Sequence, residues 1–165
     1  MKKFLAWAAL SIGLFVLQTS LLPLIYFKGA GPDILLLVTA SYAFFKGSRL
    51  GSFMGFLLGL FEDLATGGYF GINIFIKMII GFACGIFSTR VVRDRFFLPV
   101  VGSMVCTAGS FLAFEIIIFC IDYTFYPVEH VQYRLLPMLC YNVIFAWPVH
   151  TLVNMVEERF HEKKQ

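Results

Sequence analysis

The sequence predicts an all-α, polytopic membrane protein with six transmembrane helices, from its composition, its apolar segments and the distribution of its Lys and Arg residues. Of 165 residues, 59% are apolar and only 14% are charged, whereas soluble domains carry about 25% charged residues. The mean hydropathy is +0.83. Water solvates such a surface poorly, so a bilayer is the expected surroundings. No polar stretch is long enough for a second domain, and we expect one transmembrane domain over residues 1–165.

Six apolar segments are long enough, or nearly so, to cross a membrane as helices of about 20 residues. The second and third are short, and a re-entrant hairpin is their alternative. In a hairpin, Lys46 and Arg49 would lie in hydrocarbon at a cost of about 2–4 kcal/mol each, so two short crossings are favoured. The first segment follows Lys2 and Lys3 as a signal peptide would, but it is too long and lacks a cleavage site, so we expect it to be retained. The expected spans are approximately 4–27, 32–45, 50–64, 71–89, 96–121 and 135–156.

The Lys and Arg residues predict the orientation of these spans, because cytoplasmic loops are enriched in them. With the N-terminus in the cytoplasm, ten fall on the cytoplasmic side, only Lys28 and Arg134 fall outside, and Lys77 lies within a span. We therefore expect both termini in the cytoplasm. The ten residues are Lys2, Lys3, Lys46, Arg49, Arg90, Arg93, Arg95, Arg159, Lys163 and Lys164.

Small residues recur every four positions in the third and fourth spans, which places them on one face of each helix. Such faces let neighbouring helices approach closely, so we expect the two spans to pack together through them. The face of the third span holds Gly51, Gly55, Gly59 and Asp63. That of the fourth holds Asn73, Lys77, Gly81, Gly85 and Thr89.

This packing predicts that Asp63 meets Asn73, with Lys77 about one helical turn away. An intramembrane lysine is costly unless it is paired or reaches water. We therefore hypothesise an Asp63–Lys77 ion pair near the outer surface, and the alternative is that Lys77 extends outward alone. Gly67, Gly68 and Gly71 lie between the spans and favour a compact turn over a phosphate-binding loop.

Polar residues also mark the last two spans. Asn142, Ala146, His150 and Asn154 form a stripe at four-residue spacing. We interpret this stripe as a source of interhelical hydrogen bonds, in preference to a proton relay through His150. Glu115 lies in the fifth span, where a carboxylate is either a functional group or a partner of an unidentified donor.

The sequence contains no motif of a hydrolase, a nucleotide-binding loop or a metalloprotease, so we expect no enzyme activity, cofactor or metal. Basic residues are not clustered as nucleic-acid binding requires. The four cysteines lie in apolar runs without C-x-x-C spacing and are expected to pack as thiols. They are Cys84, Cys106, Cys120 and Cys140.

Residues 18–94 resemble the MreD family of bacterial rod-shape-determining membrane proteins. The order and spacing of the matching pieces are more specific than any one of them, and Lys77 is not part of the pattern. The pieces are Gln18, Leu22-Pro23, Pro32-Asp33, the glycine-spaced helix ending at Asp63-Leu64, Thr66-Gly67-Gly68, Gly71, Asn73, Gly81 and Gly85.

This resemblance implies a non-enzymatic scaffold for rod shape and lateral peptidoglycan synthesis in the bacterial inner membrane. Its implied partners are a single-pass MreC-like protein, with MreB, RodA and a class B penicillin-binding transpeptidase, besides membrane lipid. It also implies a fold like the substrate-binding subunits of energy-coupling-factor transporters, so a small-solute-binding subunit is the alternative function. We expect Asp33, Asp63, Gly67, Gly68 and Asn73 to be sensitive to mutation, and the glycine faces are a candidate surface for MreC.

Overall fold

The computed structural model of the chain describes residues 2–67, 69–87, 97–122 and 131–161. Within these ranges the chain forms six α-helices and no β-strand beyond one isolated bridge between Phe27 and Ala30. The helices are α1 (Lys2–Val16), α2 (Ile34–Lys46), α3 (Ser48–Thr66), α4 (Ile72–Phe87), α5 (Phe97–Asp122) and α7 (Leu136–His161). A π-helix (Leu17–Leu21) and a 3-10 helix (Leu22–Ile25) extend α1, and a π-helix (Val131–Leu135) leads into α7.

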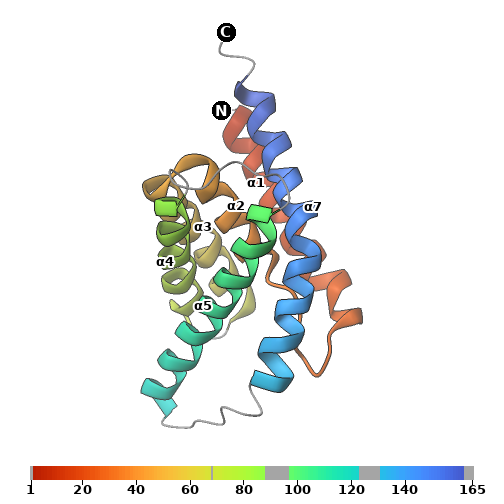
Figure 1. Cartoon of the computed structure of the whole chain (residues 1–165), viewed down its shortest axis with the longest axis vertical. Helices are drawn as coiled ribbons and strands as arrows, with labels where there is room; N and C mark the ends of the chain where they lie inside the picture. Colours follow the sequence, from red (N-terminus) through yellow and green to blue (C-terminus); the bar gives the residue numbers. More distant parts are fainter. Residues whose placement is uncertain (1, 68, 88–96, 123–130, 162–165) are drawn as a thin grey trace.

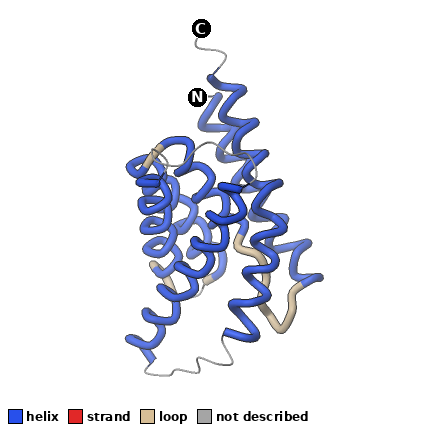
Figure 2. The backbone as a smooth tube through the Cα atoms, viewed as in Figure 1, coloured by secondary structure: helices blue, strands red, loops and turns tan. Residues whose placement is uncertain are grey.

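The helices run alternately up and down one bundle (Figure 1). The start of α1, the α2–α3 turn and the finish of α7 lie at one end, which we call the terminal end. The opposite, distal end holds the α3–α4 turn and the start of α7. Helix accounts for nearly all of the described backbone (Figure 2), so its polar groups are paired within segments as hydrocarbon requires.

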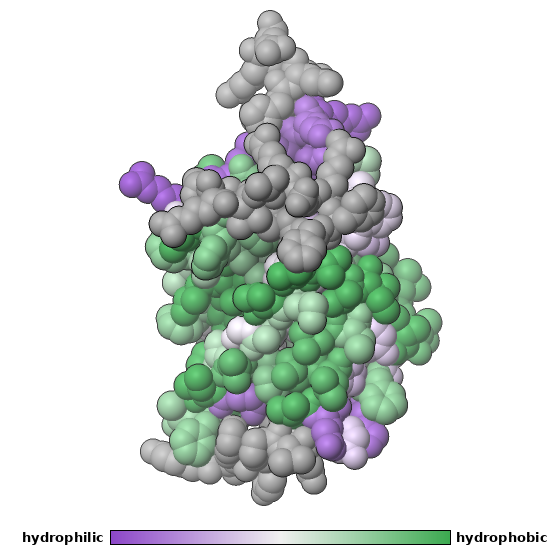
Figure 3. Space-filling view, in the orientation of Figure 1, coloured by the Kyte–Doolittle hydropathy of each residue, from purple (hydrophilic) through white to green (hydrophobic). Residues whose placement is uncertain are grey.

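The surface has the polarity of a membrane protein. Apolar residues cover the middle of the face shown in Figure 3, and hydrophilic residues gather toward both ends. Among the described residues, three stretches of helix are long and apolar enough to cross a membrane, namely Leu5–Ile25, Pro99–Ile121 and Val131–Arg159, while Ile34–Lys46 and Ile72–Phe87 are shorter apolar helices. The predicted all-α membrane fold is therefore confirmed.

The helices begin and end where the local sequence favours it. Asp33 caps α2 by accepting a hydrogen bond at 2.8 Å from the Leu36 amide, as a short acidic side chain does at a helix start. Gly47 (φ +82°) separates α2 from α3 and allows a sharp turn. Gly67 (φ +66°) ends α3 in the left-handed conformation, which glycine adopts without strain. The turn predicted around Gly67 and Gly71 is confirmed, and Gly68 lies outside the described residues.

The predicted packing of the two glycine faces is confirmed. A Cβ added at Gly55 would collide with the Lys77 carbonyl, and one at Gly59 would lie 2.5 Å from the Asn73 oxygen. Gly51 and Gly81 face each other's backbone in the same way, and Gly85 lies against Ser48. Thr89 lies outside the described residues. Each of the helices α3 and α4 covers the glycine face of the other. The expectation that the glycine faces bind MreC is therefore wrong.

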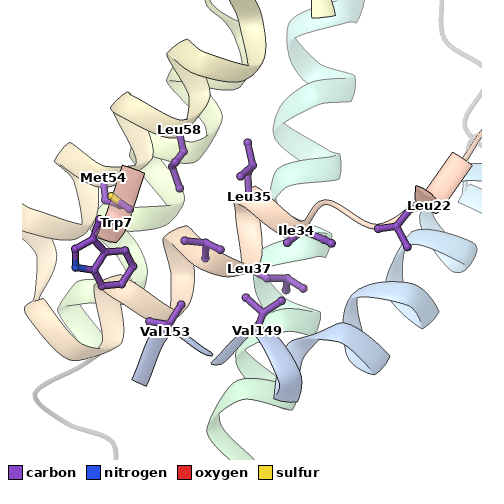
Figure 4. Close-up of a cluster of buried hydrophobic side chains, with 10 residues drawn as sticks. Trp7, Leu22, Ile34, Leu35, Leu37, Met54, Leu58, Val149 and Val153 are labelled. Atoms are coloured by element: carbon purple, nitrogen blue, oxygen red, sulfur yellow. The ribbon is translucent and has the colours of Figure 1, made fainter. Parts of the chain in front are cut away.

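The apolar core gathers around α2, which lies inside the bundle. Ile34, Leu35, Leu36, Leu37 and Val38 are each at most 2% exposed. Their neighbours come from the first helix, α3 and α7, and Figure 4 shows these side chains converging on α2. The neighbours drawn there are Trp7, Leu22, Met54, Leu58, Val149 and Val153.

The short length of α2 shapes the distal end. This helix has 13 residues, or about 20 Å at 1.5 Å per residue. Helices α5 and α7 have 26 residues each, or about 39 Å. At its other end α2 reaches the terminal end of the bundle, where Lys46 forms an ion pair with Glu157 of α7. It therefore stops well short of the distal end, and the loop of residues 26–33 lies there instead.

Candidate functional site: a polar network inside the bundle

The start of α2 is the centre of a buried ionic cluster. The Lys77 ammonium of α4 lies 2.7 Å from Asp33 Oδ2 and 2.6 Å from Glu62 Oε2 of α3. Lys77 is only 1% exposed, and Glu62 is 8% exposed. An ammonium placed so deep is stable only with compensating charge, and the two carboxylates supply it.

Hydrogen bonds extend this cluster to the first helix. Gln18, in the π-helical turn after α1, donates from Nε2 to Glu62 Oε1 at 3.4 Å. Its Oε1 accepts the Ile34 amide at 2.8 Å, at the first turn of α2. One glutamine thus binds both the carboxylate of α3 and an amide that has no partner within α2.

The network continues on the other side into α5 and α7. Asn142 of α7 accepts the Asp33 amide at 2.9 Å and donates at 2.8 Å to Thr107 Oγ1 of α5. Both Asn142 and Thr107 are fully buried. We call the connected set the polar network, and it links the π-helical extension of α1 with α2, α3, α4, α5 and α7. Its members are Gln18, Asp33, Glu62, Lys77, Thr107 and Asn142.

Asp63 has a different role from the one we hypothesised. Its carboxylate accepts the amides of Gly71 at 2.9 Å, Asn73 at 3.3 Å and Ile74 at 3.2 Å. It therefore caps the N-terminus of α4, where the helix dipole favours negative charge. The Asn73 side chain also donates to it at 2.9 Å, so the predicted Asp63–Asn73 contact is confirmed.

The hypothesis of an Asp63–Lys77 pair is wrong, and so is the alternative in which Lys77 extends outward alone. Lys77 lies one helical turn beyond Asn73, away from the start of α4, whereas both Asp63 oxygens are bound by the first amides of that helix. Glu62 is rotated by about 100° from Asp63 on α3 and faces Lys77. Asp33 completes the cluster from α2.

The remaining predicted site residues lie on α5 and α7, and only some of them belong to the polar network. Asn142 is in the network and Ala146 is buried, while His150 stacks on Phe45 with ring centroids 5.0 Å apart. The interhelical hydrogen bonds predicted for the stripe of α7 are therefore confirmed at Asn142, and Ala146 and His150 are buried without such a bond being shown. Asn154, at its end, donates to Glu158 of the same helix at 2.7 Å. Glu115 is buried on α5, near the distal end and apart from the network's hydrogen bonds described above.

Gln18, Glu62 and Thr107 were not predicted as site residues. Glu62 carried a usable signal, because an ionisable residue inside an apolar span is a candidate by default. Gln18 was marked only as one piece of the family resemblance. Thr107 shares a helix face with Ser103 and Ser110, at spacings of four and three residues, and this signal was not used.

A cavity of about 420 Å³ opens beside the network toward the distal end. The network supplies one part of its lining through Gln18, Asp33, Glu62 and Lys77. Apolar side chains of α4, α5 and α7 supply another part, and Arg134 lies at its margin. The cavity occupies the space that the short α2 leaves between the longer helices. It brings charged groups of the interior into contact with the outside of the bundle.

Comparison with known protein families identifies the family to which this helical bundle belongs. A family model described as rod shape-determining protein MreD matches residues 1–156. The chain belongs to the MreD family. It is thus a rod-shape-determining membrane protein, from a family that is not a known enzyme family. The match extends beyond the 18–94 region in which the resemblance was found.

Neither the comparison with curated proteins nor that with solved structures gave a match. The expected likeness of MreD to substrate-binding subunits of energy-coupling-factor transporters therefore has no support from a solved fold. The MreD match also does not favour the alternative function as a solute-binding subunit.

Proposed function

We propose that this protein is a non-catalytic scaffold of the bacterial cell-elongation machinery that positions wall-synthesis partners in the membrane. The observation that carries the proposal is the family match over residues 1–156. The polar network supports it physically, because a scaffold needs fixed helix positions and the network ties the extension of α1 to the other five described helices. In this proposal the network holds the bundle in one arrangement and performs no chemistry.

The proposed topology has six crossings of the cytoplasmic membrane, with the terminal end in the cytoplasm. Lys46 and Arg49 lie in the α2–α3 turn at the terminal end, and Lys28 and Arg134 belong to the distal side. This distribution agrees with the enrichment of Lys and Arg in cytoplasmic loops. The predicted cytoplasmic residues Arg90, Arg93, Arg95, Lys163 and Lys164 lie outside the described residues.

Reporter fusions test the topology. A fusion after Gly47 should be active with a cytoplasmic reporter, and a fusion after Gly67 with a reporter that works only outside the cytoplasm. The reverse pattern would contradict the proposed orientation. Equal cytoplasmic activity at both sites would contradict separate crossings of α2 and α3 and favour the re-entrant hairpin.

The proposed partners are an MreC-like single-pass protein and, with it, MreB, RodA and a class B penicillin-binding transpeptidase. Since the glycine faces are occupied inside the bundle, partner helices must use outward apolar faces or loops. Helix α4 offers one such face, with exposed side chains at helical spacing. This face also suits lipid, which is the competing occupant. It consists of Phe75, Ile79, Phe82 and Ile86.

Photocrosslinking in a rod-shaped host tests partner binding. A host that depends on this chain for its shape receives a copy with a photoreactive residue at Phe82, which is 50% exposed, or at Ile76, which is 5% exposed. The proposal predicts rod shape with the copy altered at position 82, a crosslink to the MreC-like protein from that position, and no such crosslink from position 76. Rod shape without protein crosslinks from position 82 or other outward positions of the six helices would contradict a scaffold that acts through helix faces.

A further inference from the structure

In the interior of the cavity at the distal end, carboxylate groups outnumber ammonium groups. Asp33 and Glu62 share one ammonium, that of Lys77, so these three groups have a formal net charge of −1 when ionised. Little water is available inside a bilayer to solvate a carboxylate, and an uncompensated charge there is costly. A second cationic group that entered the cavity would therefore be stabilised beside the two carboxylates.

The margin of the same cavity has the opposite charge. The Arg134 guanidinium lies 4.3 Å from the centre of the Phe114 ring of α5. Stacking on an aromatic ring orients a guanidinium so that its N–H groups point outward in its own plane, where they can bind an anion. The buried Glu115 carboxylate of α5 also interacts electrostatically with this guanidinium, so a bound anion would share Arg134 with it. Such a planar donor binds phosphate and carboxylate oxygens through paired hydrogen bonds.

About half of the lining is apolar. Ile76 of α4, Phe111 and Phe114 of α5, and Met138 of α7 all contribute to it. A ligand that fits must therefore have a cationic end, an anionic group and some apolar surface. Ligand cavities of this size generally combine apolar walls with a few convergent polar groups.

We propose that this cavity is a binding site for a zwitterionic phospholipid headgroup of the phosphoethanolamine type. Its primary ammonium lies beside Asp33 and Glu62, where it donates hydrogen bonds to the carboxylates. Its phosphate lies against Arg134, and its acyl chains remain in the surrounding bilayer. The inference needs only that the bundle lies in a membrane, and it is independent of the scaffold function proposed above.

The headgroup chemistry gives the first test. The full-length protein, purified in a non-zwitterionic detergent, is titrated with phosphatidylethanolamine, phosphatidylcholine and phosphatidylglycerol and monitored by native mass spectrometry. Phosphatidylethanolamine should bind at one site about tenfold more tightly than the other two lipids, since one charge-assisted hydrogen bond accounts for that ratio. Choline cannot donate hydrogen bonds, and glycerol has no positive charge. Equal affinity for all three lipids would overturn the proposal.

A soluble ligand distinguishes a membrane lipid from a free zwitterion. Glycerophosphoethanolamine has the same polar groups and lacks acyl chains, so it should bind much more weakly than the lipid. If it binds as tightly as phosphatidylethanolamine, the site accepts a soluble zwitterion and the lipid assignment is wrong.

Substitutions give the second test. Arg134→Gln removes the anion-binding group from the exposed margin and should weaken phosphatidylethanolamine binding about tenfold. Lys28→Gln is the matched control, because Lys28 stacks on Tyr133 without lining the cavity, and it should leave binding unchanged. Equal effects of the two substitutions would overturn the role of Arg134.

The ammonium side is tested in the same assay with Glu62→Gln, which should reduce the preference for phosphatidylethanolamine over phosphatidylglycerol. The phosphatidylglycerol affinity in the same variant shows whether the site is still formed. An unchanged preference in a variant that still binds phosphatidylglycerol would overturn the placement of the ammonium. If the variant binds none of the three lipids, equal affinity of the unmodified protein for phosphatidylethanolamine and phosphatidylcholine would overturn the placement, because an ammonium that donates to Asp33 and Glu62 must be distinguished from choline.

Discussion

Gly55 of α3 lies directly against the backbone carbonyl of Lys77 in α4, where an added Cβ would collide. One point of close approach between the two helices thus occurs at the residue whose side chain enters the polar network. Because the backbone of α4 is held there, the Lys77 ammonium reaches both Asp33 and Glu62. The glycine face and the ionic cluster are therefore two parts of one arrangement.

Gly55→Ala should destabilise the protein by about 1–3 kcal/mol, because overpacking forces the two backbones apart. The free energy of unfolding in detergent micelles, measured by titration with a denaturing detergent, checks this value. Gly13→Ala in α1 is the control, since an added Cβ there meets no atom within 4 Å. It should be neutral or slightly stabilising because alanine favours helix. Equal losses in the two variants would contradict the role of close packing at Gly55.

Lys77→Met should destabilise the protein by about 3–5 kcal/mol, because it leaves two buried carboxylates without their cation. The same unfolding measurement checks this loss. Lys77→Met combined with Glu62→Gln should recover part of it, since one buried negative charge is removed. Failure of the second substitution to recover any stability would show that charge compensation is not the role of Lys77.

The same approach distinguishes the partners of Lys77. A double-mutant cycle between Lys77→Met and Asp33→Asn should give a coupling of about 0.5–3 kcal/mol, the range for residues in contact. The cycle between Lys77→Met and Asp63→Asn should give a smaller value, because Asp63 binds the amides of α4 instead. A larger coupling with Asp63 would contradict the arrangement of the network.

Local features of the sequence predicted much of the fold. The number of helices followed from the apolar segments, and the α3–α4 packing followed from glycines repeated every four residues. The Asp63–Asn73 contact was predictable for the same reason, because a short turn joins two helices whose matching faces were already assigned. Each of these inferences used residues close together in the chain or a repeated spacing.

The partners of Lys77 could not be predicted in this way. Asp33 is 44 positions from Lys77, and their contact depends on how α2 packs against α4, which the spacing within either helix does not determine. Gln18 enters the network only because the π-helical turn after α1 lies beside the start of α2. Glu62 could have been proposed as a partner, since a buried lysine needs carboxylates and this residue lay in an apolar span.

Asp63→Asn should destabilise the protein by about 1.5–3 kcal/mol, the range for hydrogen bonds to a charged group. The amide retains one oxygen acceptor and loses the charge that the α4 N-terminus stabilises. Unfolding in detergent measures the loss, with Glu158→Gln as the control. Glu158 is an exposed carboxylate that accepts one hydrogen bond from Asn154, and its substitution should change stability by less than about 0.5 kcal/mol. Comparable effects of the two would contradict the capping role of Asp63.

Asn142→Leu should destabilise the bundle by about 1–2 kcal/mol, because two interhelical hydrogen bonds are lost at about 0.6 kcal/mol each. The substitution also leaves the Asp33 amide without its acceptor at the start of α2. Asn154→Leu is the matched control on the same helix, since among the described residues the Asn154 side chain donates to Glu158 of α7 itself. It should change the free energy of unfolding by less than about 0.5 kcal/mol. If Asn142→Leu is as mild as the control, the hydrogen-bonded link from α7 to α2 and α5 contributes little, and the bundle is held by its apolar core, the glycine packing and the Lys77 cluster.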